Sequence, residues 1–345
     1  MFGELDDPVT CRRTGMAQPL VTVGICTKNS EETVGSTMES IAGQHFPKND
    51  IEIVIVDGSS TDNTLGITRD FLSRSSMKNR VFDDNHRGLG AARQMVVDHA
   101  SGEFIVWVDS DVVLARDFLR KQVDFLIENR NVAICRGKGE YCGWGSNLQE
   151  TQNLFFSVME VVYFGATISR VKALKDVGGF DSHIKGAAED VDIVTRLRYR
   201  GWRVSMNYEA RFYHAPKETL SSLYRQSLWF GYGDHYIGHK YPALIKIPYR
   251  LPPVFFAYGF KISLKAYHQY RKKKSFLIPF LCLFKSLGWS IGFLKGHLNG
   301  YGHSFRESKL MKSCELRLEQ SGSVNRASKQ AVLLIPARSV GVSYL

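Results

Sequence analysis

The sequence of 345 residues contains only six cysteines, which form neither a CxxC pair nor a regular framework. Small secreted domains often depend on such a framework, so this cysteine pattern favours a reducing compartment. The first twenty residues, MFGELDDPVTCRRTGMAQPL, also lack the apolar core of a signal peptide. We therefore expect the functional part of the chain to face the cytoplasm.

Acidic residues are absent between Asp234 and Glu307, whereas twelve lysines and arginines lie in that segment. They account for the whole formal net charge of +11. The same segment contains the apolar runs LPPVFFAYGF and SFLIPFLCLFKSLGWSIGFL. Basic residues among aromatic ones can bind nucleic acid, but long runs of Leu, Phe and Ile beside lysines favour an anionic membrane surface. We therefore expect a membrane partner and no nucleic acid.

We expect residues 247–296 to lie in the membrane interface and not to cross the membrane as two spans. The first apolar run has ten residues between Arg250 and Lys261, and a span needs roughly 20. The second run, 275–294, is long enough but has a central Lys285. A lysine at the middle of a bilayer costs about 2.5–3.5 kcal/mol on insertion scales.

In the interface, the basic residues 271–274 would meet anionic headgroups. Five aromatic side chains would enter the acyl boundary: Phe255, Phe256, Phe276, Phe280 and Trp289. The expected location is the cytoplasmic face of the cell membrane, with peripheral or monotopic attachment. The alternative is that these helices pack on the catalytic domain without touching a membrane.

The first part of the chain alternates apolar strand-like segments with amphipathic helical ones. Strands are predicted at 20–27, 51–57 and 104–108, with a helix after each of the first two and another beginning near Gly88. This order is typical of the α/β class, with a mainly parallel sheet flanked by helices on both faces. In such sheets the ligand crevice lies at the carboxyl ends of the strands.

Polar residues follow three of these predicted strands: the segment 27–29, Asp57, and the pair Asp109 and Asp111. One such residue alone is usually a turn or cap. Two carboxylates at the edge of a crevice would repel each other unless a cation lies between them. Mg²⁺ prefers oxygen ligands and is often shared between carboxylates and substrate phosphates. The three strand ends together therefore predict a metal site that binds a diphosphate.

Four ordered motifs resemble those of the family 2 inverting glycosyltransferases, which have the GT-A fold. They are VTVGICTKNSEETVGSTMESI, IEIVIVDGSSTDNT, GLGAARQMVVDHASGEFIVWVDSD and GGFDSHIKGAAEDVDIVTRLRYRGWRV. The resemblance covers about residues 20–215. One departure is Gln94, because family members often have asparagine after the preceding Ala-Arg.

The resemblance implies a role for ten residues. The donor-binding ones are Thr27, Asn29, Asp57, Arg93 and Asp109, with Asp57 on the base and ribose. The metal ligands are Asp109, Asp111 and His214, for Mg²⁺ or Mn²⁺. The catalytic base is Asp190, and Glu189 and Arg225 are assigned to the acceptor or the diphosphate. For His214, a structural role at a strand end is the open alternative, and the motif around Arg225 matches only loosely.

The Glu189–Asp190 pair has a chemical rationale of its own. The acceptor hydroxyl must lose its proton as it attacks the anomeric carbon opposite the leaving diphosphate, so a carboxylate must stand across the sugar from the metal. The pair opens a predicted helix. We expect the positive end of this helix to keep Asp190 ionised.

The sequence therefore predicts a GT-A domain over 20–217, between an N-terminal tail, 1–19, and a basic, apolar helical extension, 218–300, followed by a tail, 301–345. The predicted activity is metal-dependent inverting transfer from a UDP-, GDP- or dTDP-sugar to a lipid-linked or envelope glycan acceptor. The alternatives are a polyprenyl-phosphate sugar synthase, a sugar-nucleotide pyrophosphorylase and a non-catalytic binding protein. The pyrophosphorylase is disfavoured because GICTKNSEE is not a glycine-rich, basic nucleotide loop.

Overall fold

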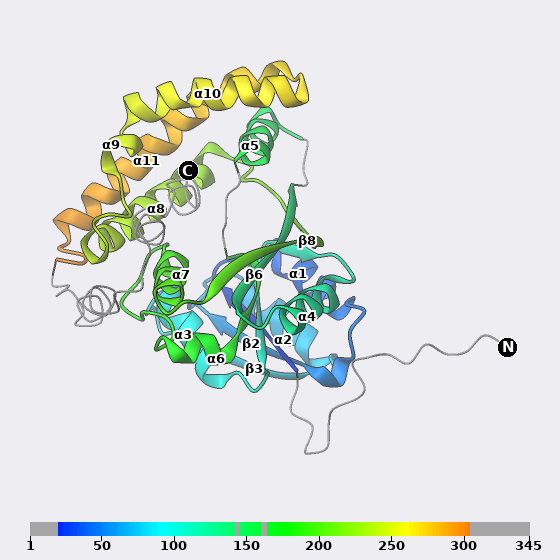
Figure 1. Ribbon diagram of the computed structural model, residues 1–345. Coiled ribbons are helices and arrows are strands. Elements are labelled where there is room, and N and C mark those ends of the chain that lie inside the picture. The colour runs from blue at the N-terminus through cyan, green and yellow to red at the C-terminus, as the bar shows by residue number, and fades with distance from the viewer. Residues whose placement is uncertain (1–19, 142–144, 160–163, 304–345) are drawn as a thin grey trace.

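A computed structural model describes residues 20–141, 145–159 and 164–303 of the chain (Figure 1). The predicted tail 1–19, and residues 304–345 of the predicted C-terminal tail, lie outside the described residues. Within them, eight strands form one sheet in the order β3-β2-β1-β4-β7-β6-β8-β5. The strands are β1 Val21–Thr27, β2 Ile51–Asp57, β3 Lys78–Asp83, β4 Phe104–Val108, β5 Val112–Leu114, β6 Val132–Tyr141, β7 Ala166–Arg170 and β8 Arg203–His214.

The sheet is parallel where the sequence predicts alternating strands and helices, and mixed beyond it. Strand β1 pairs in parallel with β2 and β4, and β2 pairs in parallel with β3. Strand β7 runs antiparallel to both β4 and β6, and β5 runs antiparallel to β8. Strand β6 pairs in parallel with β8, so four of the seven described strand pairs are parallel and the predicted mainly parallel sheet is confirmed. The three antiparallel pairs were not predicted, because a hydrophobic period reveals a strand but not its direction.

Helices cover both faces of the sheet because both faces are apolar. Val23 and Ile25 of β1 belong to one core cluster, and Val54 and Val56 of β2 belong to a second cluster on the opposite face. Such alternation follows from the period of two in a strand. The covering helices are α1 Val34–Ala42, α2 Thr64–Ser73, α3 Leu89–His99, α4 Phe118–Glu128, α6 Val171–Asp176 and α7 Glu189–Tyr199.

The remaining helices form a separate layer beside the sheet (Figure 1). They are α5 Asn147–Val158, α8 Leu220–Lys240, α9 Ile247–Arg250, α10 Pro252–Tyr270 and α11 Ile278–Leu298, with a 3₁₀ turn at Lys273–Leu277. Helices α8 and α11 pack with their backbones close together. A Cβ on Gly292 would lie 1.9 Å from the carbonyl oxygen of Leu228, and a Cβ on Gly231 would lie 1.9 Å from that of Trp289. Only glycine permits this approach.

The helical layer is not independent of the predicted catalytic domain, because α5 contributes to its core. Leu154 and Phe155 of α5 share a buried cluster with Phe255, Ile262 and Ile278. The boundary at 217/218 nevertheless coincides with a local break, since Thr219 caps the N-terminus of α8 in a capping box. The division into domains stays a prediction.

Two of the five aromatic side chains expected in the acyl boundary are buried within the protein. Phe255 is 3% exposed and Trp289 is 5% exposed. The indole N–H of Trp289 donates a 2.8 Å hydrogen bond to Asp234, and Arg250 lies 3.8 Å from the same carboxylate. The amphipathic period indicates that one face is apolar, but it does not distinguish a lipid-facing side chain from a core one.

The central lysine of the second apolar run also points inward. Lys285 is buried, and its ammonium group lies 5.1 Å from the ring centre of Phe156. In the part of the chain that the structure describes, the segment Lys273–Leu298 meets the length and composition of a membrane span, and half of its most apolar stretch is buried in the protein. The cost expected for a lysine facing lipid therefore does not apply to Lys285.

Candidate active site

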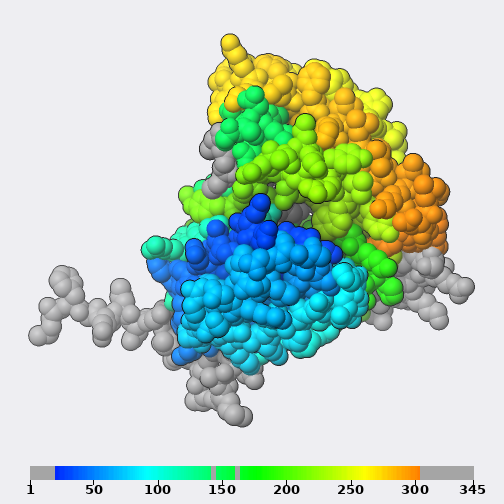
Figure 2. Space-filling view, turned by 180° about the vertical axis from the view of Figure 1, so that it is seen from behind, coloured from blue at the N-terminus to red at the C-terminus, as the bar shows by residue number. Residues whose placement is uncertain are grey.

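A cavity of about 860 Å³ lies between the carboxyl ends of β1 and β4 and the helices α8 and α11. Figure 2 shows it as a hollow between the N-terminal part of the sheet, in blue, and the C-terminal helices. Nine of the ten predicted site residues line this cavity: Thr27, Asn29, Arg93, Asp109, Asp111, Glu189, Asp190, His214 and Arg225. The predicted crevice at the strand ends is therefore present.

Asp57 is the predicted site residue that does not line the cavity. It is fully buried, and its carboxylate accepts hydrogen bonds of 2.7 Å from both the N–H and the Oγ–H of Ser60. Its neighbour Gly58 lines the cavity instead, as does Asp84 after β3. Asp84 was not predicted, because β3 is an edge strand without a fully buried residue and carries no apolar run.

Asp111 lies beside the imidazole of His214 and the ammonium group of Lys217. The Nε2 of His214 and the Nζ of Lys217 are each 3.2 Å from its Oδ2. The antiparallel pairing of β5 with β8 places His214 opposite Val112, next to Asp111. Burial alone would raise the pKa of Asp111, but His214 and Lys217 outweigh burial and hold the pKa below its usual range. Asp111 is therefore ionised at neutral pH.

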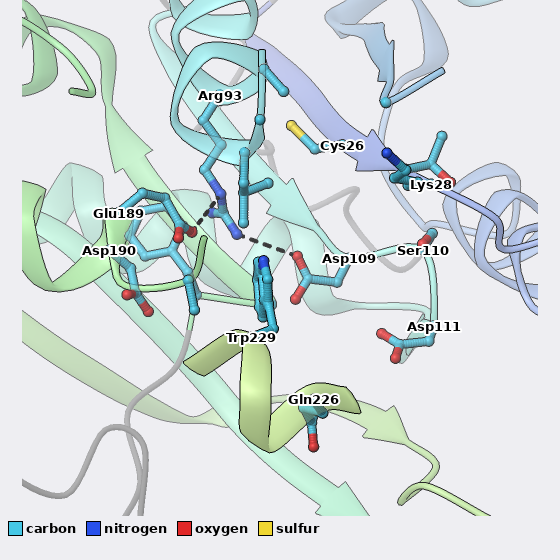
Figure 3. A pocket seen from close by; sticks show the side chains of 18 of the residues that line it. Cys26, Lys28, Arg93, Asp109, Ser110, Asp111, Glu189, Asp190, Gln226 and Trp229 are labelled. Carbon is cyan, nitrogen blue, oxygen red and sulfur yellow. Dashed lines mark hydrogen bonds and ion pairs between the residues drawn. The ribbon is translucent and has the colours of Figure 1, made fainter. Parts of the chain in front are cut away.

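Asp109 has a different counterion. Its Oδ1 lies 3.5 Å from a guanidinium nitrogen of Arg93, and the Nε of Arg93 lies 3.0 Å from Oε1 of Glu189 (Figure 3). Arg93 is buried, and its guanidinium lies over the ring of Phe164 at 4.6 Å. Arg93 thus joins the Asp109 strand end to the start of α7. The expected repulsion between Asp109 and Asp111 is relieved by protein cations, so it does not by itself require a metal.

Asp190 lies at the start of α7 and lines the cavity. Ala188, which precedes the pair, has φ 84°, a left-handed conformation that costs about 1–3 kcal/mol for a residue with a Cβ. Burial and the nearby charge of Glu189 raise the pKa of Asp190 well above its usual range. The expectation that the helix end keeps Asp190 ionised is therefore wrong in direction, because desolvation outweighs the helix dipole. A raised pKa makes a carboxylate a stronger base.

Helices α8 and α11 add three side chains to the cavity that were not among the predicted site residues: Gln226, Trp229 and Lys285. Gln226 and Trp229 are three residues apart and so share one face of α8. Figure 3 shows the Trp229 ring between the Asp109 side and the Asp190 side of the cavity. Burial lowers the pKa of Lys285 to about 8. The spacing of Gln226 and Trp229 on α8 could have indicated from the sequence that both face the same side. The inward direction of Lys285 depends on how α11 packs.

Comparison with protein families agrees with this geometry. Residues 104–294 match the family described as "Glycosyl transferase family group 2", and residues 22–178 match "Glycosyl transferase family 2". The chain belongs to glycosyltransferase family 2. The predicted family and enzyme class are thereby confirmed, and this glycosyltransferase is neither a pyrophosphorylase nor a simple binding protein.

Two curated relatives and one solved structure illustrate the similarity. The glycosyltransferase is 30% identical over 208 residues to the poly(ribitol-phosphate) beta-N-acetylglucosaminyltransferase TarS of Staphylococcus aureus, which covers 57% of this chain and 36% of TarS. It is 28% identical over 222 residues to the poly(ribitol-phosphate) beta-glucosyltransferase of Bacillus spizizenii, which covers 59% of this chain and 34% of that protein. The matches thus span about a third of the length of these relatives.

The solved structure is the mannosyltransferase PcManGT from Pyrobaculum calidifontis, in complex with GDP-Man and Mn²⁺. It has a TM-score of 0.53 and 19% identity, and the match covers 92% of this chain and 86% of that one. At this identity the similarity shows the fold alone, which confirms the predicted GT-A-type α/β class.

Proposed function

We propose that this glycosyltransferase moves a sugar from a nucleotide-sugar donor to a hydroxyl of a lipid-linked or envelope glycan, with inversion and with a divalent cation. The observation that carries the proposal is that one cavity holds Asp111 and His214 on one wall and Asp190 on another. Inverting transfer needs this arrangement, because the base and the leaving group act on opposite sides of the anomeric carbon.

The residues around Asp111 fit a divalent metal ion. The carboxylate of Asp111, just before β5, meets the imidazole of His214 at the end of β8, and Asp109 directly follows β4. Oxygen ligands suit Mg²⁺, and Mn²⁺ also accepts imidazole. Lys217 now compensates the charge of Asp111, so a cation would displace it. A bound divalent ion would neutralise charge that develops on a diphosphate leaving group.

The protein's own side chains would carry out the remaining steps. Asp190 accepts the proton of the acceptor hydroxyl at its carboxylate as the new glycosidic bond forms. Arg93 positions Asp109 and Glu189 through its two ion pairs. Trp229 of α8 lines the cavity between Asp109 and Asp190 (Figure 3) and would exclude water from the reacting atoms. Transfer to water would otherwise compete with transfer to the acceptor.

The part of the cavity near Thr27 and Arg93, where we place the donor, contains buried polar atoms without a hydrogen-bond partner in the described part of the chain. Thr27 Oγ1 and Arg93 Nη1 are buried and have no hydrogen-bond partner among the described residues. Buried polar groups are rarely left unpaired without a reason. The complex of PcManGT with GDP-Man and Mn²⁺ supports a nucleotide sugar and a divalent ion as ligands of this fold. A UDP-, GDP- or dTDP-sugar is therefore the proposed donor.

A polyprenyl-phosphate sugar synthase is the second candidate, and one observation favours it. Lys217, Arg225 and Lys285 all line the cavity, and Arg225 and Lys285 belong to α8 and α11. Three basic groups suit an anionic acceptor or the leaving diphosphate. A phosphate acceptor is already deprotonated and would need little help from Asp190.

The donor proposal is tested by thermal unfolding of the full-length protein with UDP-, GDP- and dTDP-sugars, each with and without Mn²⁺. A ligand that binds the folded state at 100 times its Kd stabilises that state by about 2.7 kcal/mol. We expect one nucleotide class to raise Tm with Mn²⁺ and to raise it much less with EDTA. No shift with any nucleotide, or equal shifts with EDTA, would contradict the proposal.

We further propose that α10 and α11 bind the cytoplasmic face of the membrane by lying in its interface. Both helices expose many apolar side chains: Val254, Tyr258, Phe260, Leu264, Phe280, Leu287, Ile291, Leu294 and Leu298. Phe276 and Leu277 of the intervening 3₁₀ turn are exposed as well. We infer that these exposed apolar side chains form the interaction surface, because large exposed apolar patches mark such sites. Lys272 and Lys274 contribute less charge than expected, since both pair with Glu150 of α5.

Replacement of exposed apolar residues should release the protein from vesicles. Leu264, Phe276 and Phe280 are 62%, 48% and 60% exposed, so their triple change to serine should leave the fold intact. We expect the wild type to float with phosphatidylglycerol-containing vesicles and the triple variant to stay at the bottom of the gradient. Ile127→Ser is the matched control, because Ile127 is 47% exposed on α4; this variant should float.

Equal flotation of the triple variant and the wild type would overturn the interfacial proposal. Carbonate-resistant, protease-shielded insertion of residues 275–294 would show a transmembrane span in its place.

A further inference from the structure

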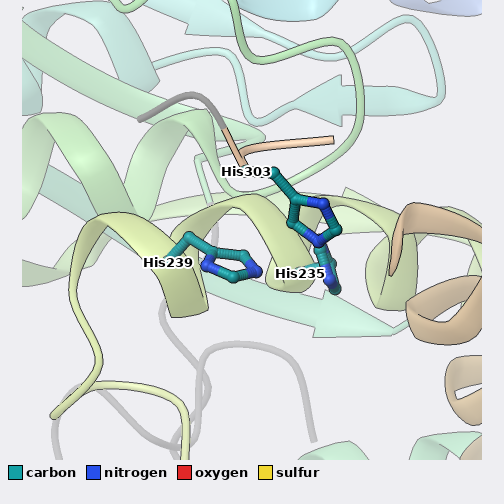
Figure 4. A group of neighbouring side chains, drawn as sticks. All are labelled: His235, His239 and His303. Atoms are coloured by element: carbon teal, nitrogen blue, oxygen red, sulfur yellow. The ribbon is translucent and has the colours of Figure 1, made fainter. Parts of the chain in front are cut away.

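Four histidines from three segments gather away from the catalytic cavity. His235 and His239 lie one turn apart on α8, His297 lies in the last turn of α11, and His303 follows that helix. Figure 4 shows His235, His239 and His303 with their rings turned toward one another. None of the four lines the cavity described above, so this histidine cluster has no part in the proposed transfer reaction.

The distances within the histidine cluster are those of a near-formed metal site. The ligand nitrogens of His235, His239 and His303 lie within 4.8 Å of one another. The Nε2 of His303 is 3.3 Å from the Nδ1 of His297. Two nitrogens bound tetrahedrally to zinc at 2.0–2.1 Å are about 3.3 Å apart. Small rotations of exposed side chains would therefore close the site, and two histidines at i and i+4 are a known metal-binding spacing on a helix.

The backbone fixes His235 in the tautomer that a metal requires. Its Nδ1 lies 2.7 Å from the carbonyl oxygen of Tyr301. A carbonyl only accepts, so Nδ1 carries the proton and Nε2 keeps its lone pair. Metal-bound histidines usually have such a second hydrogen bond.

Close packing brings α11 to His235. A Cβ on Gly296 would lie 2.8 Å from the Cβ of His235, so glycine is needed there. After α11 the chain turns through Gly300 and Gly302, which have φ of 63° and 88°. This turn returns His303 to α8, where its ring centre lies 5.0 Å from that of His239. The chain path therefore converges on the histidine cluster.

We propose that His235, His239 and His303 bind a divalent transition-metal ion of the zinc class, with His297 as the fourth imidazole at the edge of the site. Imidazole suits zinc, copper and nickel, whereas carboxylates suit magnesium. The histidine cluster and the Asp109–Asp111 pair thus select different ions. A metal here would join α8, α11 and the turn at 300–303.

The turn at 300–303 also reaches the loop before the catalytic pair. Tyr301 stacks on Tyr232 of α8 at 4.5 Å, and its hydroxyl accepts a 2.6 Å hydrogen bond from the N–H of Lys185. The same hydroxyl lies 3.3 Å from the carbonyl oxygen of His183. A bound ion would hold Tyr301 in place and so stabilise the loop that leads to Asp190. Its role would be structural.

Zinc content of the full-length, untagged protein tests the proposal. The protein is stripped with EDTA, incubated with Zn²⁺, desalted and measured by mass spectrometry of metals. All variants carry Asp111→Asn, so that the catalytic cavity does not contribute. We expect about one zinc per chain, and at least a tenfold loss of zinc affinity in His239→Gln and in His303→Gln, since loss of even an outer-shell partner costs 10–100-fold. Both side chains are exposed, so the variants should fold.

The matched control is His268→Gln, which removes an exposed histidine of the neighbouring α10 and should leave zinc content unchanged. Cobalt supplies a second readout, because four-coordinate Co²⁺ absorbs visible light and the His303→Gln variant should lose that band. The proposal would be overturned if the protein with an unmodified histidine cluster takes up no more zinc than the double variant His239→Gln, His303→Gln. The readouts need no donor sugar, so they are independent of the proposed transferase mechanism.

Discussion

Asp111→Asn should abolish both metal dependence and most of the glycosyl transfer. Asparagine keeps the shape of the side chain but removes the charge that would hold the cation beside His214. Metal stabilisation of a leaving group contributes several kcal/mol, so turnover should fall by at least about 10²-fold. The measurement is transfer or donor hydrolysis at increasing Mn²⁺ and Mg²⁺, with EDTA as the zero point.

The control for Asp111 is Asp117→Asn. Asp117 pairs with Lys121 on the surface, 2.6 Å away, outside the cavity, and its loss should leave turnover and metal dependence unchanged. Thermal unfolding should show both variants folded, since Asp111 is partly accessible and asparagine can still accept a hydrogen bond from Lys217. A fully active Asp111→Asn variant, or wild-type turnover that is insensitive to EDTA, would refute the metal role.

Asp190→Asn should lower turnover by about 10²–10⁴-fold while donor affinity changes little, as expected when a general base is removed. The pH dependence supplies a further readout. Because burial and Glu189 raise the pKa of Asp190, the base is protonated and inactive at low pH. The acid limb of kcat/KM should lie above the ordinary carboxyl range in the wild type and be absent from the residual activity of the variant.

Asp192→Asn distinguishes loss of the base from damage to α7. Asp192 lies in the same first turn but is directed to Lys240, 2.7 Å away, and to Arg196. It does not line the cavity. Replacement of Asp192 should lower the Tm of the protein and leave its turnover largely unchanged. A collapse of donor binding in Asp190→Asn would make Asp190 a donor ligand, and turnover that survives with a phosphate acceptor would favour the polyprenyl-phosphate synthase.

Predictions from the sequence were accurate where they depend on short segments of consecutive residues. The strands β1, β2 and β4 are short apolar runs, so burial on both sheet faces can be read from them. Asp109 directly follows β4 and Asp111 directly precedes β5, at the edge of the sheet where a ligand crevice is expected, and Asp190 lies in the first turn of α7. The sequence therefore determined the α/β class and the family, and nine of the ten residues predicted for the site line the cavity.

The errors arose where a side chain's direction depends on distant packing. The side chain of Trp289 is buried against Asp234, and Lys285 lines the cavity. None of these partners is set by hydrophobic periodicity, which reports an apolar face but not what covers it. The raised pKa of Asp190 is due to its burial and to the charge of Glu189, with a smaller contribution from Asp109, which is distant in the chain.

The sequence by itself determined which chemical groups are present and which strand end or helix start each one occupies. The tertiary structure alone decided which groups meet. The β5–β8 pairing joins His214 to Asp111, Arg93 bridges Asp109 and Glu189, and the glycine contacts of α8 and α11 assemble the histidine cluster. The physical reason is that secondary structure follows from neighbouring residues, whereas these contacts form between residues many positions apart, through packing that no short segment encodes.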